Sequence, residues 1–133
     1  MSWNDFKDRL IEQKVELCGI YDRSGKVLAS SPDFHCSPDE VATIANAFAR
    51  KNQFGYEFGV VVGGKRWAVI ILDMDSGLLI AKGKDTDNQH KTMVIAVCSQ
   101  TVIIGENKDE SVPGSDVRVA VERLQDDFKL LGY

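Results

Sequence analysis

Five apolar segments follow one another between residues 57 and 106, with only short polar linkers between them. Each segment is rich in the β-branched and aliphatic residues that favour strands. The linkers are too short for the crossover helix that parallel neighbours need, so the segments are expected to pair as an antiparallel meander. In chain order, they are EFGVVVGG (57–64), KRWAVIILD (65–73), GLLIAKGK (77–84), KTMVIAVC (91–98) and TVIIGE (101–106).

A helix and a hairpin are predicted at the start of the chain. Residues 2–13 carry apolar side chains at helical spacing, with Ser2 as a candidate N-cap and Asp5 in the first turn, where it complements the helix dipole. The apolar segments VELCGIY (15–21) and KVLAS (26–30) flank the turn formers DRSG. This arrangement predicts two antiparallel strands joined by a tight turn.

Two more helices are predicted, one before the meander and one after it. The first covers residues 37–51, with Ser37 as N-cap, Pro38 at its first position and Glu40 where a capping box needs it. The second follows the polar loop NKDESVPGSD (107–116). Its apolar face is expected to consist of Val117, Val121, Leu124, Phe128 and Leu131.

These elements predict a single α+β domain over residues 1–133, with a central antiparallel sheet of about seven strands flanked by helices. A chain of 133 residues is long enough for one core without disulfides or metals. The net charge of −4 argues against nucleic-acid binding. The apolar runs are too short to span a membrane, and the three cysteines, an odd number without a CxxC pair, predict reduced thiols in the cytoplasm.

Catalytic motifs are few in this chain. His35 and Cys36 are adjacent, so their side chains point in opposite directions on an extended segment and are poorly placed as a nucleophile–base pair. DMDSG and KDTDN lack the glycine and distal glutamate of a calcium loop, and VVVGGKR lacks the spacing of a phosphate loop. We expect no catalytic residue, metal or cofactor, and the alternative is a hydrolase or thiol enzyme that uses Cys36 or His35.

Several short motifs occur in the order and spacing of a profilin. They are MSW at the start, SGKVLASSPDF leading into SPDEVATIANAF, GVVVGGKRWAVI, the strand pair before VPG, and VERL near the end. Together they span essentially the whole chain, which resembles a divergent profilin. The resemblance implies a cytoplasmic, cytoskeletal protein whose terminal helices lie side by side. It also implies three kinds of partner, which are monomeric actin, proline-rich proteins such as formins, and anionic phosphoinositides.

The resemblance implies a polyproline site on the first and last helices. Trp3 and Phe6 match two aromatic positions of that site, although Phe6 lacks the hydroxyl of the usual tyrosine. Leu28 and Asp127 stand where aromatic residues are usual, and Tyr133 matches an aromatic found in some members. We expect Trp3, Phe6 and Tyr133 to form an incomplete aromatic surface with weakened proline binding; alternatively, Trp3 only ties the first helix to the last.

The resemblance also implies an actin-binding face on the later strands and the start of the last helix. Lys82 and Lys84 alternate along one predicted strand, so they point to the same side, where cations suit an acidic partner. Binding is expected to speed nucleotide exchange on actin. The loop KGKDTDNQHK (82–91) is expected to bring two aspartates toward this basic pair. The matching positions are Gly59, Arg66, Lys82, Lys84, His90, Thr92, Gly114, Arg118 and Glu122.

Four of these positions, Arg66, Lys82, Lys84 and Arg118, also match a phosphoinositide-binding patch. We expect weak binding there, because the chain is acidic overall and each surface cation adds only about 1 kcal/mol near an anionic membrane. A profilin-like interaction module without actin binding is the alternative function.

Overall fold

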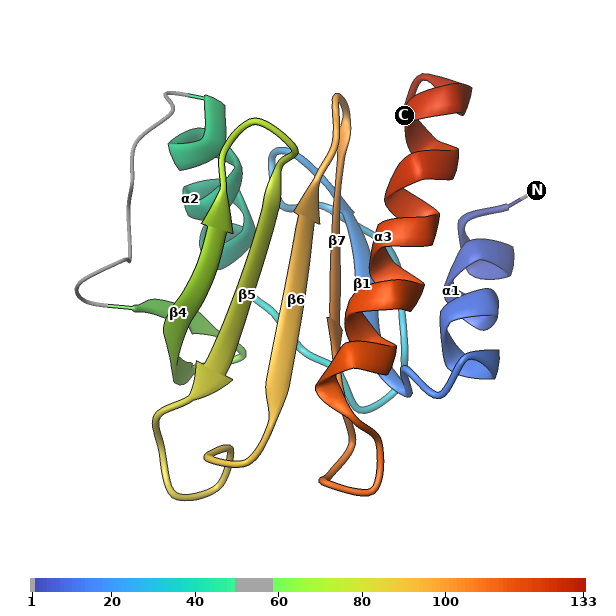
Figure 1. The fold of residues 1–133 in the computed structure, drawn as a ribbon. Helices are drawn as coiled ribbons and strands as arrows, with labels where there is room; N and C mark the ends of the chain where they lie inside the picture. The colour runs from blue at the N-terminus through green and yellow to red at the C-terminus, as the bar shows by residue number, and fades with distance from the viewer. Residues whose placement is uncertain (1, 50–58) are drawn as a thin grey trace.

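The computed structural model describes residues 2–49 and 59–133, which form three helices and one seven-stranded sheet (Figure 1). Residues 50–51 of the predicted second helix and 57–58 of the first meander segment lie outside the described residues. The elements are α1 (Trp3–Glu12), β1 (Leu17–Asp22), β2 (Val27–Ser30), α2 (Pro38–Ala49), β3 (Val60–Val62), β4 (Lys65–Asp73), β5 (Leu78–Gly83), β6 (Thr92–Val97), β7 (Thr101–Glu106) and α3 (Gly114–Leu131).

The described sheet is antiparallel throughout, with the strand order β2-β1-β7-β6-β5-β4-β3. Strands β3 to β7 form the predicted meander. The β1–β2 hairpin extends it, because β1 pairs along its whole length with β7. The predicted α+β fold and antiparallel meander are therefore confirmed.

Helices cover both faces of the sheet, with α1 and α3 side by side on one face and α2 on the other (Figure 1). Successive strand residues point to opposite faces, so Ile103 packs against α1 and α3 while Ile104 packs on the α2 side. Each face therefore has its own apolar core. The predicted side-by-side placement of the terminal helices is confirmed.

Both predicted N-caps form reciprocal capping boxes. The Ser2 hydroxyl accepts the Asp5 N–H at 3.2 Å, and the Asp5 carboxylate accepts the Ser2 N–H at 2.9 Å. At the start of α2, the same exchange joins Ser37 and Glu40 at 3.2 and 2.8 Å. Each box satisfies backbone donors that the first helical turn cannot pair internally.

Two expectations about the last helix are wrong. The helix begins at Gly114, inside the segment 107–116 that was predicted as a loop. Pro113 is the last extended residue before it and serves as the N-cap. Leu131 is 53% exposed and not part of the apolar face. The helix ends at this residue, and Tyr133 folds back against Phe128, with its N–H donating to the Phe128 carbonyl at 2.9 Å. The Tyr133 ring, and not the Leu131 side chain, therefore packs against the core between α1 and α3.

Candidate functional site

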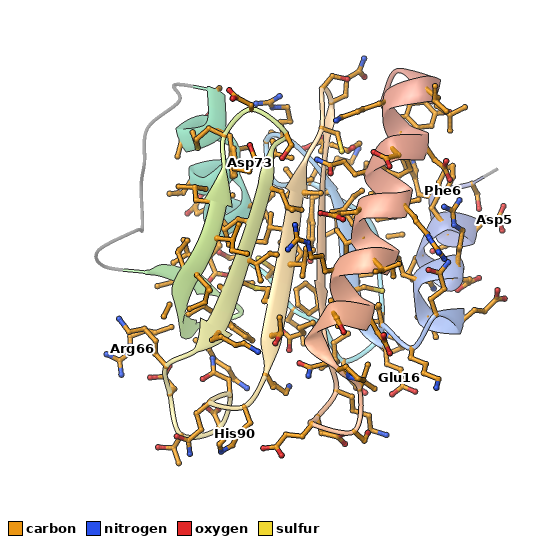
Figure 2. The ribbon with its side chains drawn as sticks, in the orientation of Figure 1. Asp5, Phe6, Glu16, Arg66, Asp73 and His90 are labelled. Atoms are coloured by element: carbon orange, nitrogen blue, oxygen red, sulfur yellow. The ribbon has the colours of Figure 1, made fainter. Side chains whose placement is uncertain are left out.

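Part of the sheet's α3 side lies open, because α3 packs over β6 and β7 and does not extend over β3 and β4 (Figure 1). On this side Ala68 lies opposite Lys82, and Arg66, two residues earlier on β4, projects the same way. Figure 2 shows Arg66 at the lower end of this surface. We call it the sheet face, and its residues are Val61, Arg66, Ala68, Ile70, Ile71, Lys82 and Lys84.

The centre of the sheet face is apolar because of a β-bulge in β4. The register with β5 shifts between Val69 and Ile71, so Ile70 is an extra residue in the strand. Val69 and Leu72 pack in the α2-side core, whereas Ile70 and Ile71 between them are 52% and 38% exposed. Val61, opposite Arg66 on the edge strand β3, is 50% exposed. The sheet face therefore presents aliphatic side chains beside its cations.

Asp85 holds Arg66 in a fixed position. The Arg66 Nε and Nη2 atoms donate to Asp85 Oδ1 at 2.9 and 2.7 Å, and the Arg66 backbone N–H donates to Oδ2 at 2.9 Å. These hydrogen bonds lower the pKa of Asp85 below its ordinary value, and the bond from the Arg66 backbone has the larger effect. Arg66 is therefore a partly neutralised cation.

Lys82 and Lys84 are the cations of the sheet face that form no ion pair within the described residues. Lys82 Nζ donates to the Thr92 hydroxyl at 2.5 Å, and Lys84 lies just past the end of β5, with its N–H donating to the Arg66 carbonyl at 3.0 Å. The two aspartates of the β5–β6 loop form ion pairs with other cations: Asp85 pairs with Arg66, and Asp87 with Lys65 at 3.2 Å.

A buried corner supports the lower end of the sheet face. Thr92 is only 4% exposed and lies beneath Gly114, where any side chain would collide with it. The Thr92 N–H donates to Asn107 Oδ1 at 2.8 Å, and Asn107 Nδ2 donates to the carbonyls of Asp109 and Val112 at 3.0 and 2.9 Å. Thr92 and Gly114, expected in the binding face, thus pack closely against each other where α3 begins.

The remaining predicted face residues lie around the edge. His90 in the β5–β6 loop faces Glu110 at 3.3 Å, and Arg118 pairs with Glu122 one helical turn later at 3.1 Å. Gly59, with φ of +82°, precedes β3 at a point where a side chain would collide with the β4 backbone. Arg118 is therefore ion-paired within its own helix, and His90 lies beside a carboxylate of the loop before α3.

Four aromatic rings from the two ends of the chain meet between α1 and α3. We call Trp3, Phe6, Phe128 and Tyr133 the aromatic shelf. The Trp3 and Tyr133 ring centroids are 5.1 Å apart, those of Phe6 and Phe128 are 4.9 Å apart, and Trp3 meets Phe128 edge-on at 5.8 Å. Phe6 and Phe128 are buried, whereas Trp3 and Tyr133 are half-buried. The shelf thus has two accessible rings, Trp3 and Tyr133, packed on two buried rings, Phe6 and Phe128.

The other predicted polyproline residues offer little aromatic surface. Phe6, expected to form part of the open aromatic surface, is only 3% exposed, and its ring centroid lies 6.1 Å from that of Trp3. Leu28 packs half-buried against the α1–α3 core, and Asp127 forms an ion pair with Arg9. Because positions 28 and 127 carry no aromatic ring, Trp3 and Tyr133 are the accessible rings of the aromatic shelf.

Two asparagines that were not predicted as site residues shape the loops beside the sheet face. Asn88 is 1% exposed; its Oδ1 accepts the Asp85 N–H at 2.8 Å and its Nδ2 donates to the Arg66 carbonyl at 3.0 Å. Asn107 plays the same part in the loop before α3. Both occur in turn-forming clusters, where asparagine commonly bonds backbone groups, and this was the available signal.

The model of the profilin family matches residues 1–133. The chain belongs to the profilin family. It is 29% identical to the profilin of Branchiostoma belcheri over 128 residues, which cover 95% of this chain and 94% of that relative. It is 31% identical to profilin-1 of Entamoeba histolytica over 115 residues, or 84% of each chain. Profilin family members are actin-binding proteins and not enzymes, and the resemblance inferred from the motifs is confirmed.

Solved profilin structures share this fold. Acanthamoeba castellanii profilin II is similar with a TM-score of 0.83 at 23% identity, covering 99% of this chain and 100% of that chain. LokiProfilin1, solved in complex with rabbit actin, has a TM-score of 0.73 at 14% identity, covering 98% of each chain. Mouse profilin IIa, solved with a double repeat from the FH1 domain of mDia1, has a TM-score of 0.73 at 15% identity, covering 96% and 99%.

Within residues 2–49 and 59–133, no cluster of three or more histidine, cysteine or acidic side chains is arranged to hold a metal ion. Asp73 instead accepts the N–H groups of Asp75 and Ser76, both at 3.1 Å, and shapes the β4–β5 turn. None of the helices described for this profilin is long and apolar enough to cross a membrane.

Cys36 is expected to react slowly with thiol reagents at neutral pH. Burial, reinforced by the negative charge of Glu40, raises the pKa of Cys36 to about 12, so the reactive thiolate is scarce near pH 7 and increases only in strong alkali. Alkylation of this profilin, resolved by peptide mass spectrometry, should be at least about tenfold slower at Cys36 than in free cysteine. A rate equal to that of free cysteine would contradict this and favour the thiol-enzyme alternative.

Proposed function

We propose that this chain binds monomeric actin through the sheet face and thereby regulates actin polymerisation in the cytoplasm. Membership of the profilin family supports the proposal, as does the complex that LokiProfilin1 forms with rabbit actin. One observation carries it: Lys82 and Lys84, which have no ion-pair partner among the described residues, stand beside the exposed aliphatic centre of the sheet face. Such a surface suits an acidic partner with an apolar contact area.

The proposed mechanism is a shift in the conformational population of actin. If the sheet face binds better to monomers whose nucleotide cleft is open, it raises the fraction of open monomers and speeds the release of ADP and the uptake of ATP. The size of that shift is limited by the difference in affinity for the open and closed states. No chemical step in this chain is required.

A nucleotide-release measurement tests this function directly. Monomeric actin is loaded with a fluorescent ATP analogue, mixed with excess unlabelled ATP, and followed with increasing concentrations of this protein. We expect the release rate to rise and then saturate as the protein binds all the actin. An unchanged rate with actin demonstrably bound would contradict the exchange activity, and failure to bind an actin column would favour the alternative, an interaction module without actin binding.

Proline-rich segments are the second proposed ligand, and the aromatic shelf supports this proposal. The half-buried rings of Trp3 and Tyr133 offer flat apolar surfaces that suit proline rings in a polyproline II helix. Mouse profilin IIa was solved with such a formin segment. Because positions 28 and 127 carry no ring, we propose weaker binding than a complete groove provides, measurable by titration with a proline-rich peptide.

Weak phosphoinositide binding is also proposed, through Arg66, Lys82, Lys84 and Arg118. Arg66 and Arg118 are paired with carboxylates, so only the two lysines contribute uncompensated charge among these four. Each uncompensated lysine adds about 1 kcal/mol near an anionic membrane surface. Sedimentation with vesicles containing a phosphoinositide should therefore show binding that physiological salt largely removes.

A further inference from the structure

The turn between β6 and β7 holds the C-terminal residues of the chain in place. The Gln100 N–H donates to a main-chain oxygen of Tyr133 at 2.5 Å, and the Thr101 hydroxyl donates to the same oxygen at 3.4 Å. The Tyr133 N–H donates in turn to the Phe128 carbonyl at 2.9 Å. These contacts fix the backbone of Tyr133 at both its polar groups, so the turn determines where its ring lies in the aromatic shelf.

Arg23, from the turn between β1 and β2, holds the other side of the same turn. Its Nη1 donates to the carbonyls of Cys98 and Ser99 at 3.0 and 3.3 Å, and its Nη2 donates to the Ala45 carbonyl in α2 at 3.4 Å. Hydrogen bonds from a charged guanidinium to neutral carbonyls are stronger than those between neutral groups. One side chain thereby joins three segments that are distant in sequence.

We propose that Arg23 is a positioning residue for the aromatic shelf: by holding the β6–β7 turn, it places Tyr133 against Trp3. The proposal rests on the proposed proline-binding function, but Arg23 is not part of the shelf and acts through the turn. A preformed ring pair binds a peptide more tightly than one that must first be ordered, because less conformational entropy is lost on binding.

Removal of the guanidinium should loosen the turn without unfolding the domain. Arg23, Cys98 and Ser99 line an open hollow of about 430 Å³ at this end of the molecule, so water can reach the released carbonyls. Water then donates to these carbonyls in place of Arg23, but it cannot connect the β6–β7 turn to α2 as the guanidinium does. The expected result is local mobility of Gln100 and Tyr133.

Three variants test the inference. Arg23→Gln removes the charged fork, Arg23→Lys keeps the charge but not the bridging geometry, and Lys26→Gln removes an exposed cation from the same hairpin region as a matched control. Hydrogen exchange at the Gln100 amide measures how often the β6–β7 turn opens. Titration with a proline-rich peptide, followed by Trp3 fluorescence, measures the affinity of the aromatic shelf for the peptide.

Arg23→Gln is expected to accelerate Gln100 exchange by about tenfold and to raise the peptide Kd by about three- to tenfold, with Arg23→Lys intermediate. Lys26→Gln should match the parent protein, and nucleotide release from actin should be unaffected by all three variants.

Unchanged Gln100 exchange in Arg23→Gln, or faster exchange with an unchanged peptide Kd, would overturn the inference. If Arg23→Gln accelerates exchange throughout the core, Thr101→Val provides a second test. This variant removes the hydroxyl that donates to Tyr133, so it should also raise the Kd for the proline-rich peptide. If the parent protein binds no peptide, the proposed proline binding fails, while Gln100 exchange still decides whether Arg23 holds the turn.

Discussion

Charge reversal of the two unpaired lysines, Lys82→Glu combined with Lys84→Glu, is expected to weaken actin binding by about a hundredfold, or roughly 3 kcal/mol. Both side chains are exposed, and neither is ion-paired within residues 2–49 and 59–133. The substitutions replace attraction to an acidic partner with repulsion, and they add two carboxylates beside Asp85. The acceleration of nucleotide release should be lost at protein concentrations that saturate the parent chain.

The control for this prediction is Lys26→Glu combined with Lys14→Glu, which makes the same change in net charge on exposed residues outside the sheet face. This control should retain actin binding, and both double variants should keep the melting temperature within a few degrees of the parent because surface charges contribute little to stability. Equal loss of actin binding in the two variants would indicate a general charge effect and count against the sheet face as the site.

Phe128→Ala is expected to lower the free energy of unfolding by about 3–5 kcal/mol, a large share of the stability of a small domain. The Phe128 ring is fully buried and meets the rings of Trp3, Phe6 and Tyr133 edge-on at 5.8, 4.9 and 5.6 Å. Loss of this ring leaves a cavity beneath Trp3 and Tyr133, so the affinity for proline-rich peptides should fall as well. Urea denaturation measures the change in the free energy of unfolding.

Leu130→Ala is the matched control, since Leu130 lies two residues away on the same helix and is 87% exposed. Its effect on the free energy of unfolding should stay within about 0.5 kcal/mol. A loss below about 1 kcal/mol in Phe128→Ala would show that the four rings do not form a tightly packed unit, and would contradict the role given to the two buried rings.

The strand and helix pattern was predictable because it depends on local periodicity. The short runs of β-branched and aliphatic residues, such as TMVIAV and TVIIGE, and the turn formers between them, led to the correct antiparallel meander. Ser2 and Ser37 indicated helix starts that form the predicted capping boxes. The end of the last helix was harder, because Leu131 matches the helical spacing and only the return of Tyr133 onto Phe128 excludes it from the core.

The candidate surfaces were predictable in position but not in accessibility. Trp3 and Tyr133 meet as expected, yet Phe6 lies beneath them and Phe128 completes the cluster. Neither fact follows from spacing along either helix, since it depends on how the two helices cross.

The α+β class, the order of the elements, the profilin resemblance and the positions of the cations along the later strands can all be read from the sequence, because each depends on neighbours along the chain. Tertiary structure alone decided which charges remain unpaired and which side chains are exposed. Asp85 reaches Arg66 across 19 positions, and Arg23 reaches Cys98 across 75. Contacts of that kind depend on the folding of distant segments against one sheet, and no local pattern specifies them.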